Sequence, residues 1–144
     1  MGLFFIALFL IFCNYVYIDQ GGIMINLIVL ACLLALVQLW IIPAIFNLNN
    51  TKWMISNRDE EPEVSANYKR ARRAWHNLQE TFPIFLVLAV LGVITGTDLM
   101  FEMQLWLVFR VAHLITYMAS LNPLRTLSWI GSLVALIMMG LALI

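Results

Sequence analysis

Charge is scarce in this chain of 144 residues. Lys, Arg, Asp and Glu make up 11% of it, whereas ordinary soluble domains contain about 25%. Hydrophobic residues make up 63%, which is more apolar surface than a soluble core of this size can hide. Lipid must therefore cover much of the chain, and we expect an all-α membrane protein with one domain.

Cysteine is also rare, and its two positions follow no known pattern. Cys13 and Cys32 lie in separate apolar stretches, and their spacing fits neither a disulfide framework nor a zinc site. No cationic group lies near either thiol in the sequence, so we interpret both as small core residues. The chain likewise lacks a Gly-rich phosphate loop and any Ser-His-Asp or Cys-His arrangement.

Basic residues are missing from most of the chain. Of the eight, six lie between residues 48 and 73, and the other two are Arg110 and Arg125. The six are Lys52, Arg58, Lys69, Arg70, Arg72 and Arg73. Acidic residues at 59–63 dilute this cluster and no recognition motif accompanies it, so we expect no nucleic-acid partner. The positive-inside rule places the 48–73 loop in the cytoplasm, and the short loops favour a bacterial inner membrane.

Four long apolar spans follow one another along the chain. They cover about 24–47, 65–97, 99–121 and 124–144. Each is long enough to cross a hydrocarbon layer about 30 Å thick. Ser65 fits an N-cap of the second span, Pro83 should kink that span, and Asn122-Pro123 marks the turn between the last two. We predict a four-helix transmembrane bundle over residues 23–144.

The N-terminal segment, residues 1–22, is a further apolar stretch of uncertain status. It lacks the basic region of a signal peptide and is slightly short for a span. Gly21-Gly22 separate it from the next segment. An extra helix, a loosely attached terminus and a mis-set start codon are all open. With four spans both termini lie outside the cell, and with five the N-terminus lies in the cytoplasm.

Polar residues inside the third span carry the clearest functional signal. Arg110, His113 and Tyr117 lie at i, i+3 and i+7, so a helix places all three on one face. An arginine near the middle of a membrane helix costs about 2.5–3.5 kcal/mol on insertion scales. Such a residue is usually turned inward and kept for function, although a buried structural ion pair is the simpler interpretation.

The second span begins with a polar face of its own. Arg73, Asn77 and Glu80 lie at i, i+4 and i+7, with His76 beside them. Pairing of Glu80 with Arg110 would neutralise both charges but leaves the other polar residues unexplained. Together the two faces predict a pocket, open to the cytosol, that suits a small zwitterionic or anionic ligand beside a lipophilic one.

Other polar and small residues have plainer interpretations. His76, His113 and Glu80 could supply metal ligands, but neither HxxxH nor HExxH spacing occurs, so we expect no metal site. Gly92 and Gly96 form a GxxxG pair that permits close helix packing. The five tryptophans fit interfacial or core positions, and they are Trp40, Trp53, Trp75, Trp106 and Trp129.

Two stretches resemble the signatures of a known family. Residues 73–83, RAWHNLQETFP, are similar to the RAxxNxxE signature of the membrane-associated proteins in eicosanoid and glutathione metabolism, the MAPEG family. Residues 109–117, FRVAHLITY, are similar to its RxxHxxxY signature. The following residues 122–126, NPLRT, resemble the stretch found at this point in prostaglandin E synthase-like members. The resemblance covers about residues 24–144.

The resemblance implies a homotrimer of four-helix bundles that holds glutathione, as a cosubstrate, near the cytoplasmic face. It implies that glutathione is bound or framed by Arg73, His76, Asn77, Glu80, Arg110, His113 and Tyr117. Glu80 would take its α-amino group and the arginines its carboxylates. Arg125, with Thr126 beside it, matches the catalytic position that holds the sulfur as a thiolate for attack on a lipophilic electrophile or hydroperoxide.

The chain departs from the family at two positions, and three functions are open. Some members carry a basic residue late in the first helix, where this chain has Gln38, and His76 stands where prostaglandin synthase-like members have arginine. The first function is a membrane-bound glutathione transferase, with glutathione-dependent peroxidase activity as an extension. The second is a non-catalytic lipid-binding or scaffolding protein of the same fold. The third is a small ion-conducting oligomer built around the intramembrane charges.

Overall fold

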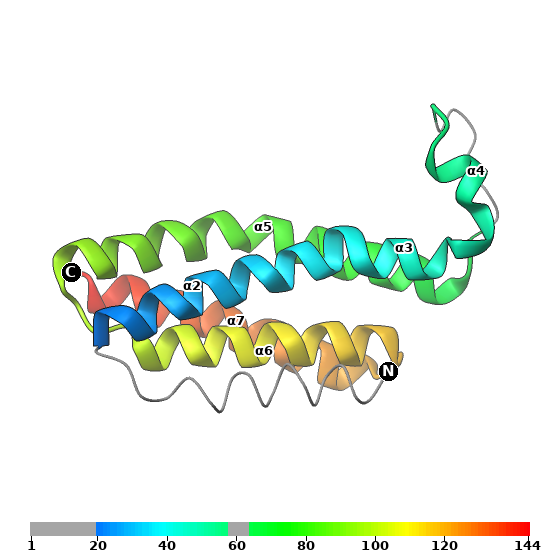
Figure 1. Ribbon diagram of the computed structural model, residues 1–144. Helices are drawn as coiled ribbons and strands as arrows, with labels where there is room; N and C mark the ends of the chain where they lie inside the picture. The colour runs from blue at the N-terminus through cyan, green and yellow to red at the C-terminus, as the bar shows by residue number, and fades with distance from the viewer. Residues whose placement is uncertain (1–19, 58–63) are drawn as a thin grey trace.

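Most of the described residues lie in helices. The computed structural model describes residues 20–57 and 64–144, so the expectations for residues 1–19 lie outside the described residues. The elements are α2 Gln20–Leu36, η1 Val37–Ile41, α3 Ile42–Phe46, η2 Leu48–Asn50, α4 Thr51–Met54, α5 Ala66–Thr95, α6 Met100–Met118 and α7 Asn122–Ala142. The segment from α2 to α3 is continuous and packs against α5 and α6. Helix α7 packs against the same two helices, and the whole forms an elongated bundle (Figure 1). The predicted four-helix bundle is confirmed.

The first segment changes its winding where the chain approaches Pro43. Proline has no backbone N–H and cannot donate to the carbonyl four residues earlier. One residue before it, the N–H of Ile42 donates to the carbonyl of Val37, a spacing of five residues, and Val37–Ile41 forms a π-helical turn. This wider turn packs against α5 and buries Gln38. At the other end of the segment, Gly21 and Gly22 lie in the first turn of α2. They follow directly on residues outside the described part of the chain, so their role as a boundary between two segments stays a prediction.

Local signals in the sequence set both ends of α5. The hydroxyl of Ser65 accepts a hydrogen bond from the backbone N–H of Tyr68 at 3.2 Å, which confirms the predicted N-cap. Gly96 ends the helix in the left-handed region, with φ of 69°, where glycine is unstrained. Gly92 is the only packing residue of the GxxxG pair, since a Cβ there would lie 2.5 Å from the side chain of Leu99. The interpretation of both glycines as packing residues is therefore wrong for Gly96.

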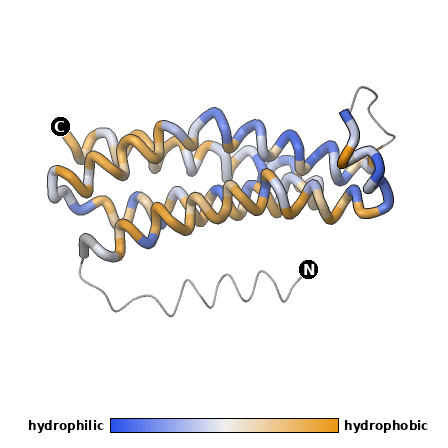
Figure 2. Tube along the Cα trace, turned by 45° about the horizontal axis from the view of Figure 1, so that its top comes forward, coloured by the Kyte–Doolittle hydropathy of each residue, from blue (hydrophilic) through white to orange (hydrophobic). Residues whose placement is uncertain are grey.

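Three segments of the described chain are long and apolar enough to cross a membrane, namely Gly22–Phe46, Ala66–Thr95 and Asn122–Ala142. The fourth helix, α6, has 19 residues, or about 28 Å of helix. It contacts α2, α5 and α7 and buries Arg110 and His113 among them. Hydrophobic residues dominate along the bundle, and hydrophilic residues gather where α5 begins (Figure 2). Arg110 and His113 are therefore shielded from lipid by the other helices.

The helices α6 and α7 pack closely against each other after a tight turn. Ser120 adopts a positive φ of 62° in this turn. Asn122 and Pro123 were predicted to form the connection itself. In the structure they lie just after it, in the first turn of α7. A Cβ added to Gly131 would lie 2.6 Å from the ring of Phe109. The absence of a side chain at residue 131 therefore lets α6 approach the backbone of α7.

Replacement of Gly131 by alanine should destabilise the bundle. The added methyl group must displace the Phe109 ring, and overpacking of this kind costs about 1–3 kcal/mol. Gly140→Ala is the matched control, because nothing lies within 4 Å of a Cβ at that position. We expect a lower thermal unfolding midpoint in detergent for Gly131→Ala alone. Equal midpoints for the two variants would contradict the close α6–α7 packing.

Candidate functional site

A cavity of about 270 Å³ opens between α5, α6 and α7. It lies towards the end of the bundle where α6 ends and α7 begins (Figure 1). Its lining residues are Asn77, His113, Tyr117, Arg125, Thr126 and Trp129. Five of the nine predicted site residues are among them, so three helices bring together residues that are up to 49 positions apart in the sequence.

Tyr117 lies between His113 and Arg125 on the cavity wall. The ring centroids of His113 and Tyr117 are 5.4 Å apart, and the planes meet at 75°. The guanidinium carbon of Arg125 lies 4.9 Å from the centroid of the same Tyr117 ring. Edge-to-face and cation–π contacts are both stabilising. An aromatic face therefore holds Arg125 in place without using its N–H groups, which stay available to a ligand.

The charge of the cavity favours an anion. Arg125 contributes a cation, and no Asp or Glu is among the lining residues. Arg125 also lies in the first turn of α7, and the N-terminus of a helix is the positive end of its dipole. These two positive contributions repel each other unless an anion lies between them. Among the described residues, no group of three or more His, Cys, Asp or Glu could hold a metal ion.

Neutral polar groups complete the lining. The Nδ2 of Asn77 donates to the backbone carbonyl of Arg73 at 3.0 Å, which leaves its Oδ1 as an acceptor. The hydroxyl of Thr126 donates to a carbonyl one turn back at 3.2 Å, and its oxygen can still accept a hydrogen bond. Sequence reasoning missed Trp129 as a lining residue. Trp129 lies four residues after Arg125, so both share one helix face. This spacing was the signal that could have predicted Trp129 as a lining residue.

Arg110 lies outside the cavity lining and only 1% of its surface is exposed. Its Nη1 donates to the backbone carbonyl of Asn77 at 3.3 Å, and its Nη2 donates to the hydroxyl of Thr81. The guanidinium carbon lies 5.6 Å from the centroid of the Trp106 ring. Within residues 20–57 and 64–144, Arg110 forms no ion pair with Glu80, whose side chain is exposed. The two groups are therefore not in direct contact, although the charge of Glu80 is near enough to attract the guanidinium.

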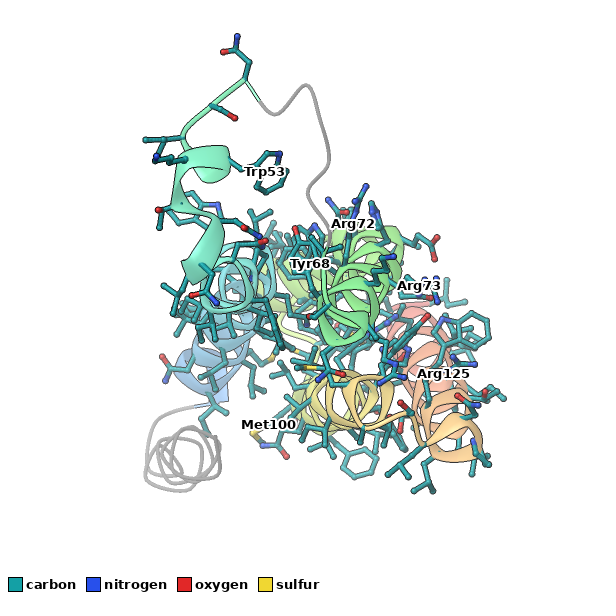
Figure 3. The ribbon with its side chains drawn as sticks, turned by 90° about the vertical axis from the view of Figure 1, so that its right-hand side faces the viewer. Trp53, Tyr68, Arg72, Arg73, Met100 and Arg125 are labelled. Carbon is teal, nitrogen blue, oxygen red and sulfur yellow. The ribbon has the colours of Figure 1, made fainter. Side chains whose placement is uncertain are left out.

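The other predicted residues of α5 lie on its outer surface. Arg73, His76 and Glu80 are exposed, and none of them lines the cavity. In the end-on view of Figure 3, Arg73 on α5 and Arg125 on α7 lie on the same side of the bundle. A single protomer thus separates the predicted residues into an open cavity, an exposed polar face beside it and the buried Arg110.

The fold and the site define a helical membrane protein with a cationic cavity near one end of its bundle. The model of the MAPEG family matches residues 24–144. No curated protein and no solved structure matches the chain. The chain belongs to the MAPEG family, the membrane-associated proteins in eicosanoid and glutathione metabolism, as the resemblance predicted. With its apolar helices, it is an integral membrane protein.

The contact between Thr81 and Arg110 can be tested by removing one hydroxyl. Thr81→Val keeps the shape of the side chain but leaves the buried guanidinium without that acceptor, a loss of about 1–3 kcal/mol. Thr81→Ser, which retains the hydroxyl, is the control. We expect thermal unfolding in detergent at a lower temperature for Thr81→Val than for Thr81→Ser. The reverse order, or no difference, would show that this hydrogen bond does not stabilise the fold.

Proposed function

We propose that the protein is a membrane-bound glutathione transferase. One observation carries the proposal: in a chain of the MAPEG family, Arg125 and Thr126 line a cationic cavity together with Asn77, His113 and Tyr117. Glutathione supplies the matching ligand, since its sulfur becomes an anion when it loses its proton. The second substrate is a lipophilic molecule that reaches the site from the bilayer.

The proposed reaction begins with ionisation of the glutathione thiol. A free thiol of this kind has a pKa of about 8.5 and is mostly protonated at neutral pH. The guanidinium of Arg125 beside the sulfur favours the thiolate, and the proton passes to solvent. The thiolate then attacks an electrophilic carbon, so that a C–S bond forms and the leaving group departs with the bonding electrons.

A hydroperoxide would react at the same sulfur. The thiolate attacks the terminal oxygen, the O–O bond breaks, and the substrate leaves as an alkoxide that takes a proton from solvent. The sulfenic acid formed on glutathione then reacts with a second glutathione, which gives the disulfide and water. Thr126, beside Arg125, can exchange hydrogen bonds with the reacting groups.

The exposed face of α5 is proposed to hold the peptide part of glutathione. Ligand pockets usually measure about 300–1,000 Å³, so a cavity of about 270 Å³ suits the thiol end better than the whole tripeptide. The carboxylate of Glu80 suits the α-amino group, while Arg73 suits a carboxylate and His76 a further polar contact. Arg110 would act indirectly, because it holds the backbone of Asn77.

A homotrimer would cover this polar face. Glu80 and Arg73 are exposed in one protomer although Glu80 stands at the start of an apolar run, where an uncovered carboxylate is costly. We propose that a neighbouring subunit closes the site there, and that the site and the 48–73 loop face the cytoplasm of a bacterial inner membrane.

The trimer can be tested by native mass spectrometry of the detergent-purified protein. We expect three copies per particle, with glutathione bound to the trimer and not to released monomers. Monomers that retain glutathione at the affinity of the intact particle would contradict a site shared between subunits. The same spectra report whether other assemblies are present.

A non-catalytic lipid-binding protein of the same fold is the second candidate. Gln38 favours it, since this residue stands where some members have a basic residue and is only 4% exposed. A buried, uncharged side chain cannot supply a cation to glutathione in a neighbouring subunit. This candidate predicts binding of lipophilic ligands without formation of a thiolate.

Removal of the Arg125 guanidinium should abolish most turnover. Loss of one charge-stabilising donor from an active site lowers kcat by about 10²–10³-fold, and we expect a loss of this size for Arg125→Ala with glutathione and chlorodinitrobenzene. Arg125→Lys should retain part of the rate because the positive charge remains. Lys52→Ala, which removes an exposed cation on α4, is the control and should keep full activity. Undiminished turnover in a folded Arg125→Ala protein would contradict the mechanism.

A further inference from the structure

A short arm, residues 48–56, leaves the bundle after α3. It contains η2 and α4, and Figure 1 shows that it turns away from the four long helical segments at the end where α5 begins. Two large apolar side chains on this arm face outward. Leu48 is 65% exposed and Ile55 is 87% exposed. The cavity uses no residue of the arm, so these exposed side chains need a separate explanation.

Helix lengths place the arm at the edge of the bilayer. The apolar segment Gly22–Phe46 has 25 residues and is about 38 Å long. A bilayer has a hydrocarbon core about 30 Å thick and measures about 40–45 Å with its headgroups. In Figure 1, α3 and the start of α5 extend past the adjacent ends of α6 and α7. The chain therefore leaves the hydrocarbon near the end of α3, and Leu48 emerges at the level of the headgroups.

Cations and aromatic residues accompany the apolar side chains at this level. Lys52 on α4 and Lys69 in the first turn of α5 are exposed. Trp53 on α4 and Tyr68 near the start of α5 are half-buried. Both elements lie at the same end of the molecule (Figure 1). Trp and Tyr favour the membrane–water interface, and basic residues beside a span attract anionic lipids. The acidic residues at 59–63 follow the arm in the sequence and lie outside the described residues.

We propose that the arm anchors the protein to anionic phospholipids. Leu48 and Ile55 insert at the boundary of the acyl chains, and Lys52 and Lys69 bind the phosphate groups of the headgroups. Charge distinguishes this occupant from a second copy. Two copies would bring the Lys52 and Lys69 of one chain against those of the other and repel each other, whereas anionic headgroups attract both cations. Glutathione has no part in this interaction, so the proposed enzymatic function can fail without affecting it.

A fluorescent probe at residue 55 tests the insertion of the arm. Ile55→Cys is labelled with an environment-sensitive fluorophore in a chain whose Cys13 and Cys32 are replaced by alanine. The labelled protein is reconstituted into vesicles that contain lipids brominated near the headgroup. We expect blue-shifted emission that these lipids quench and aqueous iodide does not. A probe at Ala66, which is exposed at the start of α5, is the control and should be quenched by iodide.

Phosphatidylglycerol tests the charge part of the proposal. Added to phosphatidylcholine vesicles in increasing fractions, it should increase the lipid quenching of the probe at residue 55. In Lys52→Gln the midpoint of that increase should move to an about fivefold higher fraction, which corresponds to one lost cation at a membrane surface. The neutral variant Asn57→Gln, at an exposed position near the end of the arm, should leave the midpoint unchanged.

Three outcomes would overturn the proposal. Iodide quenching of the probe at residue 55 in every vesicle would place the arm in water. Blue-shifted emission without lipid quenching would show that protein, such as a second copy of the chain, covers the arm. Equal lipid quenching with and without phosphatidylglycerol, unchanged by Lys52→Gln, would show that the arm inserts without recognising anionic headgroups.

Discussion

The buried guanidinium of Arg110 is the constraint on which the arrangement of α5 and α6 depends. A charge inside a membrane bundle is tolerated when neighbouring groups supply hydrogen-bond acceptors. Here α5 supplies them with the carbonyl of Asn77 and the hydroxyl of Thr81. Further into the bundle, the rings of Phe85 and Trp106 stack with centroids 4.0 Å apart. A shift of α5 along α6 by one turn would break both sets of contacts, so the register of the two helices is fixed.

Arg110 of α6 and Arg125 of α7 are held in different ways, and this difference explains their roles. Arg110 is held by hydrogen bonds to uncharged groups, whereas Arg125 contacts the face of the Tyr117 ring. The short turn at Ser120 places Arg125 in the first turn of α7, close to the end of α6. Only the second guanidinium therefore offers N–H groups to a ligand in the cavity. Arg110 instead holds the backbone of Asn77, which lines the cavity together with His113.

The helices could be predicted from the sequence because apolar length and capping residues are local signals, as Ser65 shows. The role of Gly96 could not, since a GxxxG pattern does not distinguish a packing glycine from one that ends a helix. Helical periodicity predicted that Arg110 and His113 share a face. It could not show that His113 reaches the cavity while Arg110 contacts α5, because this division depends on where α7 packs. Trp129 shares a helix face with Arg125, four residues earlier. It was missed because an aromatic residue in an apolar span fits lipid, core or cavity equally well.

The central claim is that the cavity beside Arg125 holds glutathione as a thiolate. The most direct measurement is the ultraviolet absorbance of the thiolate as glutathione is titrated into the folded, detergent-purified protein at neutral pH. We predict a signal that saturates with glutathione and disappears when S-methylglutathione, which has no ionisable thiol, displaces it. Binding of glutathione without any thiolate signal, or no binding to a folded protein, would contradict the claim and leave lipid binding as the better-supported function.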